Sequence, residues 1–387
     1  MLRQRFDLIV VGGGLAGASL AVALGGSRLS MALVEARPPQ RPEEWDARIY
    51  AVSPANIGFL SDLGVWQRLD QGRTCAVYDM EIYGDLGARL DFSAYGAGVA
   101  ELARIVESAS MQCELWETAQ RLPNLTVLCP AHPQALALDD DAARLTLSDG
   151  RQIEASLIVA ADGANSWVRT AAGIEARFTP YGESGVVANF RISGRHLDKA
   201  YQWFRPDGVL AWLPLPGNMI SMVWSTPEEH AAELVGLDAA QLCERVAAAG
   251  SHRLGSLEVV TPAAAFPLRL MRVAQTTLAR LALIGDAAHA IHPLSGHGIN
   301  LGFQDAAVLA STLCNAPAYQ DPGDPSLLRR YARARAEEVA LLQYTTHGLQ
   351  RLFRPQNAVL SNLRNFGLNL TDHLPVVRNS LVRYALR

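Results

Sequence analysis

The chain has 387 residues, of which 49% are hydrophobic and 19% are charged, and its net charge is −4. A chain of this length is expected to form two or three lobes, and its composition excludes a disordered protein. The weak negative charge and the lack of an arginine-rich arm argue against a nucleic-acid partner. The sequence has no apolar run of about 18 residues and no basic-then-apolar leader, so we expect neither a membrane span nor a secretory signal.

The five cysteines are scattered, odd in number and without a CxxC pair. This pattern argues against disulfides and against a zinc site. It fits a reducing compartment, so we expect a cytoplasmic protein. His289, His292 and His297 lie close together in the sequence, but neither HxH nor HExxH occurs, so we predict no metal site.

A nucleotide-binding unit is predicted at the N-terminus. An apolar strand over residues 6–11 precedes a G-x-G-x-x-G pattern and a helix over residues 15–24, and a second strand over 31–34 ends on Glu35. The glycines allow backbone N–H groups to approach a pyrophosphate at the helix N-terminus. The Glu35 carboxylate can accept hydrogen bonds from a ribose and would repel a 2′-phosphate. The unit alone does not separate FAD from NAD. The pattern consists of Gly12, Gly14 and Gly17.

A second motif follows in the middle of the chain. Residues 145–156 read as a hairpin with its turn at Asp149-Gly150, and residues 157–161 read as a further, buried strand. That strand ends on Asp162-Gly163. In isolation such a pair is an ordinary turn, but its place after a buried strand favours a functional motif.

Residues 186–225 contain four aromatic-rich stretches separated by turn residues, which predicts an antiparallel sheet. One face of this sheet could cover a pocket. Some of its large side chains could contact a flat ring or a polyprenyl chain, although for any one of them a place in the core is the more common outcome. The candidates are Trp203, Trp212, Met222 and Trp224.

A third motif begins with a buried strand over residues 281–284, which breaks at Gly285-Asp286. A loop rich in Gly, His and Pro follows, and a helix is expected from near Gly298. Such a loop brings backbone N–H groups and a helix N-terminus toward one point, which suits an electron-rich ligand.

The last 47 residues, 341–387, carry six arginines and a single acid, Asp372, with apolar residues at helical spacing. This spacing predicts amphipathic helices. Such helices could contact an anionic lipid surface or an acidic partner protein, or they could form a solvated cap on the FAD lobe. Both readings stay open.

Taken together, the three motifs resemble those of the single-component, class A flavoprotein aromatic hydroxylases, the p-hydroxybenzoate hydroxylase superfamily. Other stretches are similar to the branch that hydroxylates the ring of ubiquinone precursors, and the similarity covers nearly the whole chain. These stretches are Asp46-x-Arg48 with Ala51-x-Ser53, Gly64-Val65-Trp66, Ile105-Val106-Glu107, Phe266-Pro267-Leu268 and the loop from His292 to Gly302.

The resemblance implies an α/β fold, in which an FAD-binding Rossmann-like lobe of the GR2 type carries an inserted antiparallel β-sheet substrate lobe and C-terminal helices. The expected FAD-binding domain comprises residues 1–74, 101–178 and 276–330. The expected substrate domain comprises 75–100 and 179–275, and the helical region comprises 331–387.

The resemblance also implies roles at matching positions. The ADP half of FAD would be held by Gly12, Gly14, Gly17 and Glu35, the pyrophosphate or ribityl region by Arg48, and the ribityl hydroxyls by Asp286. Asp162 and Gly163 would support the FAD fold and the use of NAD(P)H. The flavin ring would lie along the loop from Pro293 to Asn300, which includes Gly296, Gly298 and Ile299.

The implied activity is hydroxylation of a polyprenyl phenol or quinol in ubiquinone biosynthesis. NAD(P)H would reduce the flavin, and O₂ would form a C4a-hydroperoxide that oxygenates the ring. His292, Pro293 and His297 are the side chains expected nearest the flavin, and a histidine there could move the proton of the phenol. Partners could include other ubiquinone-biosynthesis proteins, the inner face of the membrane, and a second copy of the chain.

Departures from the family pattern keep two rival functions open. His297 stands where relatives usually have Gln, Phe303-Gln304-Asp305 replaces Leu-Arg-Asp, and Ser108-Ala109 replaces an Asn-Arg pair. One rival is a flavin oxidoreductase of the same fold that does not hydroxylate. The other is a non-catalytic scaffold of a quinone-biosynthesis complex, which the loss of that Arg makes conceivable.

Overall fold

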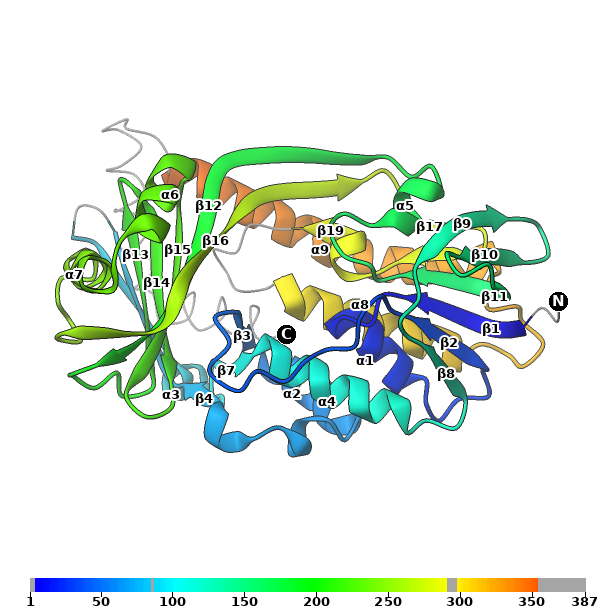
Figure 1. Ribbon diagram of the computed structural model, residues 1–387, viewed down its shortest axis with the longest axis horizontal. Coiled ribbons are helices and arrows are strands. Elements are labelled where there is room, and N and C mark those ends of the chain that lie inside the picture. The colour runs from blue at the N-terminus through cyan, green and yellow to red at the C-terminus, as the bar shows by residue number, and fades with distance from the viewer. Residues whose placement is uncertain (1–3, 85–86, 291–297, 354–387) are drawn as a thin grey trace.

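The computed structural model describes residues 4–84, 87–290 and 298–353, and it contains two large sheets joined by long strands (Figure 1). The predicted fold class is confirmed, with a mixed α/β lobe, a second lobe built on a sheet, and helices toward the C-terminus. The domain boundaries expected from the sequence stay a prediction. No helix of the described ranges combines the length and the apolar character needed to cross a bilayer.

The first large sheet is built around the N-terminal strand, which pairs in parallel with a strand on each side. These central strands are buried on both faces, as parallel strands covered by helices usually are. The order along the sheet is β17 (Thr277–Leu278), β18 (Leu281–Leu283), β11 (Gln152–Ala160), β1 (Gln4–Val11), β2 (Met31–Val34) and β8 (Leu125–Leu128), with β10 (Ala143–Leu147) and β9 (Pro133–Leu138) continuing from β11.

At β11 the structure differs from the prediction of two separate strands. The second leg of the hairpin and the buried strand after it are one continuous strand, Gln152–Ala160. Its first half pairs with β10 and alternates in burial, whereas its second half lies between β1 and β18 and is fully buried. The change from an alternating to a continuous apolar pattern therefore marks entry into the parallel sheet and not a chain break.

Helices pack against this sheet and against one another. α1 (Leu15–Ala23) and α8 (Gly298–Cys314) approach closely because small residues meet between them: a Cβ added at Gly302 would lie 3.4 Å from the Cβ of Ala16. The other helices of this lobe are α2 (Pro54–Asp62), α4 (Ser108–Gln120), α5 (Trp167–Ala171) and α9 (Pro325–Phe353).

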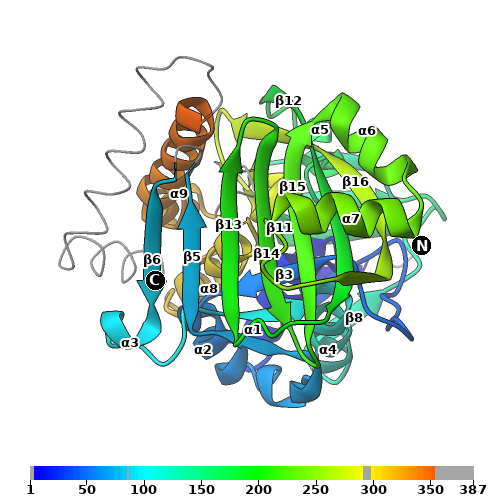
Figure 2. The same cartoon turned by 90° about the vertical axis from the view of Figure 1, so that its left-hand side faces the viewer.

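The second large sheet is antiparallel apart from one parallel pair between β13 and β5. Helices α6 (Glu228–Gly236) and α7 (Ala239–Ala249) cover the face that points away from the first lobe (Figures 1 and 2). The order along the sheet is β19 (His289–Ala290), β16 (Leu257–Val273), β12 (Ala176–Ile192), β15 (Met219–Pro227), β14 (Gly208–Leu215), β13 (Lys199–Arg205), β5 (Asp79–Tyr83) and β6 (Arg89–Ser93).

A small third sheet connects the two lobes. It consists of β3 (Ile49–Val52), β7 (Ala103–Glu107) and β4 (Cys75–Val77). Its apolar side chains pack with residues from the inner face of the second sheet, the face opposite α6 and α7. This shared core contains Ile49, Val77, Ile105, Ala200, Leu215 and Met219.

Candidate functional site

In the turn after β1, each glycine lacks a side chain for a different structural reason. Gly12 has a φ of +105°, and a Cβ there would lie 2.4 Å from the carbonyl oxygen of Ala161. A Cβ at Gly17 would lie 1.9 Å from the carbonyl oxygen of Gly12, whereas a Cβ at Gly14 would meet no protein atom within 4 Å. The fold itself therefore requires Gly12 and Gly17, while Gly14 borders open space at the start of α1, where a phosphate group would approach.

Glu35 lies at the carboxyl end of β2, as the sequence predicts, and it reaches back to the glycine turn. Its Oε2 accepts a hydrogen bond from the Gly13 N–H at 2.6 Å, and its Oε1 accepts one from the Arg37 N–H at 3.1 Å. These two bonds fix the carboxylate beside the turn. A ribose attached to a phosphate at Gly14 would meet an oriented acceptor.

Arg48 and Asp286 come from distant parts of the sequence and lie near one residue that sequence reasoning missed, Tyr50. The Arg48 guanidinium carbon lies 5.5 Å from the centre of the Tyr50 ring. Burial raises the pKa of Tyr50, with Arg48 opposing and Asp286 adding to this effect. Arg48 directly precedes β3 and Tyr50 is the second residue of that strand, so their i, i+2 spacing in extended chain is compatible with side chains on one face.

The Asp286 side chain is exposed to solvent among the described residues. The surrounding protein raises the pKa of Asp286, and the nearby charges of His289 and Arg48 oppose this. Asp286 belongs to the short 3₁₀ turn η3 (Gly285–Ala287), and Gly285 there has a φ of +57°. The turn thus places Asp286 near the charge of Arg48.

A buried ion-pair network lies behind η3, and it is the second feature that sequence reasoning missed. Asp305 is 1% exposed; its Oδ2 accepts hydrogen bonds from the Gly285 N–H at 2.9 Å and from His289 Nε2 at 2.7 Å. Its Oδ1 accepts one from Arg335 Nε at 2.7 Å. One carboxylate on α8 thus holds the residues on both sides of Asp286 and joins them to α9.

The charges of this network reinforce one another. Burial by itself would raise the pKa of Asp305 and lower that of His289. The ion pair outweighs burial, so the pKa of Asp305 is lowered and the pKa of His289 is raised. His289 is therefore part of a salt-bridge network. The only sequence signal for Asp305 was that it retains the Asp of the family's Leu-Arg-Asp run.

A second network fixes the segment that precedes Arg48. Asp46 accepts hydrogen bonds from the backbone N–H groups of Arg48 at 2.8 Å and Ala109 at 3.0 Å. The Asp46 N–H donates to Glu107 at 2.7 Å, and Glu107, which is buried, pairs with Arg73 at 2.6 Å. The start of α4 is thus tied to the Arg48 segment through Asp46, next to the Ser108-Ala109 departure.

Asp162 lies at the end of β11 beside the glycine turn. Its Oδ2 accepts a hydrogen bond from the Val168 N–H at 3.0 Å, whereas its Oδ1 is buried and has no partner in the described part of the chain. Gly163 has a φ of +83°, which explains the glycine. The unpartnered oxygen is an acceptor that a bound donor could satisfy.

Asn300 uses its side chain for structure. Its Oδ1 accepts hydrogen bonds from the Ser53 N–H at 2.9 Å and from Asn56 Nδ2 at 3.0 Å, and its Nδ2 donates to the Ala51 carbonyl at 2.9 Å. A contact of Asn300 with a cofactor would therefore involve its backbone, as for Gly298 and Ile299 in the same first turn of α8. The predicted residues His292, Pro293, Gly296 and His297 lie outside the described ranges.

The four large side chains predicted as substrate contacts lie in the hydrophobic core instead. Trp203, Trp212, Met222 and Trp224 all belong to the core formed with α6 and α7. Trp212, for example, is 1% exposed, and a Cβ added at Gly250, at the end of α7, would lie 2.1 Å from its ring. The physical reason is strand alternation: large apolar side chains recur every second residue on the helix-covered face of β14 and β15, away from the first lobe.

The inner face of the same strands carries the residues between them. Ala211, Leu213 and Val223 are partly exposed, although their sequence neighbours are fully buried. Asn189 Nδ2 on this face donates to the carbonyl of Asp46 at 2.9 Å, so the inner face lies against the Arg48 segment. The inner face of the sheet therefore lies beside the segment that carries the predicted cofactor residue Arg48.

Comparison with known proteins places these features in one family. A family model described as an FAD binding domain matches residues 5–343. The chain is 33% identical to the 3-demethoxyubiquinol 3-hydroxylase of Escherichia coli, with 100% of both chains covered. It is 33% identical to the ubiquinone hydroxylase UbiL of Rhodospirillum rubrum, with 98% of this chain and 89% of the relative covered.

Among solved structures, the fold is similar to that of PqsL from Pseudomonas aeruginosa in complex with 2-aminobenzoylacetate. The TM-score is 0.79 at 22% identity, and the match covers 94% of this chain and 99% of PqsL. The family resemblance expected from the three motifs is thus confirmed. The chain belongs to the FAD-binding-domain family, in the branch that contains the ubiquinone hydroxylases to which it is 33% identical.

Proposed function

We propose that this protein is an FAD-dependent monooxygenase that hydroxylates the aromatic ring of a polyprenyl phenol or quinol in ubiquinone biosynthesis, with NAD(P)H as the electron donor and O₂ as co-substrate. The observation that carries the proposal is the 33% identity to a 3-demethoxyubiquinol 3-hydroxylase, which extends over 100% of both chains. The proximity of Arg48, Tyr50 and Asp286 supports it, because ligands of open α/β sheets bind at the carboxyl ends of the strands. Gly285, which precedes Asp286, packs against Ala16 near the start of α1.

The residues present fit FAD. The space beside Gly14 leaves room for a pyrophosphate at the N-terminus of α1, and the fixed Glu35 carboxylate suits the adenosine ribose. The Oδ1 of Asp162 has no hydrogen-bond donor among the described residues and could accept a hydrogen bond from the cofactor. The exposed carboxylate of Asp286 could accept hydrogen bonds from hydroxyl groups. When bound, FAD would supply the electron transfer and the activation of O₂, while the protein supplies position and a dry environment.

We propose that the substrate ring lies against the inner face of the second sheet. The apolar Ala211, Leu213 and Val223 are partly exposed there and offer a surface for a ring with an apolar tail, at the border of the core that Leu213 shares with the third sheet. The hydrogen bond between Asn189 and Asp46 supports this placement, because it holds the inner face beside the Arg48 segment. The predicted roles of His292, Pro293 and His297 remain part of the proposal.

A pair of neighbouring substitutions tests the position of the substrate. Leu213→Trp adds a large ring on the inner face, so we expect a higher KM and more H₂O₂ released per NAD(P)H oxidised, with FAD affinity unchanged. The matched control is Trp212→Phe on the opposite face, which should lower thermal stability and leave KM unchanged. A raised KM in the control, together with a normal KM in Leu213→Trp, would place the substrate elsewhere.

The activity itself is tested first by the absorption spectrum of the purified protein, which should show bound flavin. Turnover under ¹⁸O₂ should then place one labelled oxygen on the ring. A flavin-bound protein whose product lacks the label would be the non-hydroxylating oxidoreductase. A colourless protein that does not bind added FAD would be the scaffold.

We also propose a peripheral contact with the membrane, since a polyprenyl substrate resides in lipid. The exposed Leu341 and Tyr344 in the second half of α9 support it, and most of the arginine-rich segment 341–387 lies outside the described residues. Co-sedimentation with vesicles containing anionic lipid should decrease for a Leu341→Glu variant. Equal sedimentation of the variant and the parent protein would remove α9 from the contact.

A further inference from the structure

Two buried polar side chains in the second large sheet make no hydrogen bond with the described part of the chain. They are Gln202 on β13 and Ser225 on β15, which are 6% and 4% exposed. Buried polar groups of folded proteins nearly always have a partner, so an exception needs a physical reason. One such reason is a bound molecule that supplies the missing partner.

Both side chains point to the inner face of the sheet. Gln202 lies between Tyr201 and Trp203, and both of these belong to the core formed with α6 and α7. Trp224, which precedes Ser225, belongs to the same core. Because successive side chains of a strand point to opposite faces, Gln202 and Ser225 lie on the face away from these helices.

The two polar residues flank the apolar surface proposed for the substrate ring. Gln202 pairs with Ala211, and Ala211 pairs in turn with Val223. Ser225 lies two residues beyond Val223 on the same strand. Ala211 is small and partly exposed, so it leaves space between the two polar side chains.

A bound molecule can reach these two residues, unlike other polar groups of the same face. Asn189 Oδ1 and Ser221 Oγ also lack a partner in the described ranges, but both atoms are fully enclosed by protein. The polar ends of Gln202 and Ser225 are not enclosed in this way. The hydrogen-bonding capacity that a ligand could satisfy on this face therefore belongs to Gln202 and Ser225.

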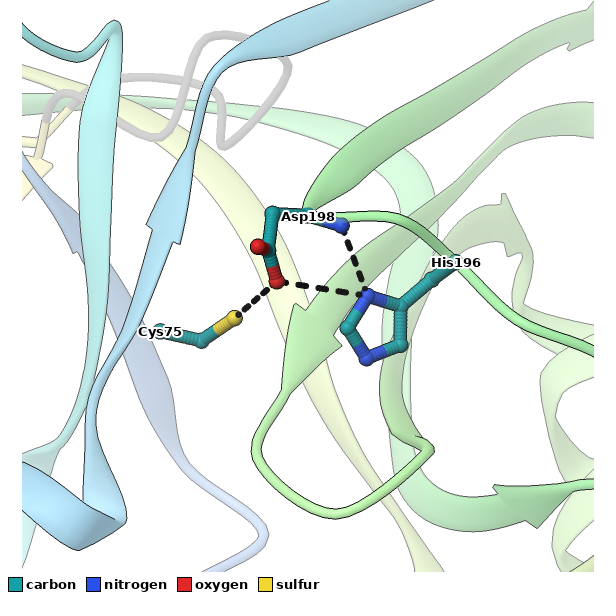
Figure 3. A group of neighbouring side chains, drawn as sticks. All are labelled: Cys75, His196 and Asp198. Carbon is teal, nitrogen blue, oxygen red and sulfur yellow. Dashed lines mark hydrogen bonds and ion pairs between the residues drawn. The ribbon is translucent and has the colours of Figure 1, made fainter.

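The strand that carries Gln202 is anchored where it begins. Cys75, His196 and Asp198 meet there in a group that we name the Cys75 cluster (Figure 3). The Cys75 thiol donates to Asp198 Oδ1 at 3.3 Å, and the Asp198 N–H donates to His196 Nδ1 at 3.0 Å. His196 Nε2 therefore carries the proton, and it donates to the Leu215 carbonyl at 3.0 Å. These bonds join β4 and β14 to the turn before β13.

We propose that Gln202 and Ser225 position the substrate by hydrogen bonding two oxygen atoms at opposite positions of its ring, the pattern of a quinol. This assignment rests on the proposed hydroxylase function. A carboxamide and a hydroxyl group can each donate or accept a hydrogen bond. Each residue can therefore bind a ring oxygen whether that oxygen carries a proton or not.

The spacing of the two residues fits such a ring. Two strand separations of about 4.8 Å and two residues of about 3.4 Å place their Cα atoms about 12 Å apart. Side chains stand roughly perpendicular to a sheet, so their polar ends keep a similar separation. A ring with opposite oxygens, with a hydrogen bond of about 2.8 Å at each end, spans about 11 Å. Two adjacent ring oxygens span too little to reach both residues.

The test compares two isomeric probes on the full-length, FAD-loaded protein. They are 2-prenylhydroquinone, whose oxygens are opposite, and 3-prenylcatechol, whose oxygens are adjacent, so their apolar groups match. Calorimetric titration under nitrogen and without NAD(P)H gives each Kd separately from turnover. One hydrogen bond is equivalent to about a fivefold change in Kd, so the parent protein should bind the hydroquinone at least about fivefold more tightly than the catechol.

Gln202→Met keeps the length of the side chain and removes both of its polar atoms. Because the carboxamide has no partner to lose, the substrate-free variant should keep the Tm of the parent protein. The Kd of the hydroquinone should rise at least about fivefold, and the preference between the isomers should disappear. Ser225→Ala should have the same effect from the other end of the ring, and it tests the proposal if Gln202→Met does not fold.

The matched control is Tyr201→Phe, which removes a polar atom from the neighbouring residue on the opposite face and should keep the preference. Equal binding of the two isomers by the parent protein, binding of neither, or a preference that survives in Gln202→Met would overturn the assignment. FAD content and turnover are measured on the same samples. A flavin-bound protein that hydroxylates a ring without isomer preference would retain the proposed function and refute this inference alone.

Discussion

Replacement of Asp305 by Asn should show that one buried carboxylate holds the Gly285-Asp286 turn in place. Asn keeps the size of the side chain but removes its charge. It can still accept a hydrogen bond from Arg335 or His289, but its NH₂ group would then face a donor on the other side. The Gly285 N–H would lose its acceptor or share a weaker one.

The magnitude follows from burial. Asp305 is 1% exposed, and removal of one partner from a buried ion pair costs about 3–5 kcal/mol, because the remaining charges are left uncompensated. With an unfolding entropy of about 2.1 cal/mol/K per residue, the melting temperature of a 387-residue chain changes by about 1.2 °C per kcal/mol. We therefore expect Tm to fall by about 4–6 °C. The FAD dissociation constant should rise at least about tenfold, the equivalent of about 1.4 kcal/mol.

Both quantities are measurable on the same sample, Tm by scanning fluorimetry without FAD and affinity by flavin fluorescence. Glu338→Gln is the control, because Glu338 pairs with the same Arg335 from a partly exposed position. Such a pair contributes about 1 kcal/mol or less, so its Tm should change by about 1 °C at most. An Asp305→Asn protein with a Tm and an FAD affinity like those of the control would refute the reasoning.

Three further predictions concern the same region. Since the pKa of His289 is raised in the folded protein, its ion pair stabilises the fold fully below about pH 6.5. The contribution should disappear as the pH rises through the higher folded value, and a His289→Gln variant should lack this component of the Tm–pH curve. Gly14→Val should leave the apo-protein's Tm nearly unchanged while weakening FAD at least about tenfold, whereas Gly17→Val should not fold. Asn300→Ala should lower stability by about 2–3 kcal/mol in urea titrations, because the buried Ser53 N–H loses its acceptor.

The local part of the fold was predictable because its causes are local. The glycine turn, the strand over residues 31–34 and the helix from residue 15 follow from short-range periodicity and from backbone conformations that only glycine adopts easily, and β2 was placed to the residue. The position of Glu35 followed from the same unit. Those residues contact one another within 35 positions of sequence.

The facing of the second sheet was not predictable in the same way. Alternation along β14 separates Trp212 from Leu213, but it does not say which of the two faces α7 and which faces the other lobe. That choice depends on helices more than ten residues further along the chain. Asp305 and the Cys75 cluster were missed for a related reason, since their partners are brought together only by the tertiary fold.

Strand β16 connects the second large sheet directly to the segment that follows Asp286. It runs for 17 residues, about 55 Å, from the second large sheet to the pairs Met271–Ala290 and Arg272–His289, which lie at the end of the described range 87–290 (Figure 1). Over that length, a tilt of about one degree at the sheet displaces the far end by about 1 Å. β12 beside it is interrupted by a bulge between Pro180 and Glu183, with Gly182 at a φ of +64°. A molecule that tilts the sheet on binding would therefore move the segment that follows Asp286 without touching it.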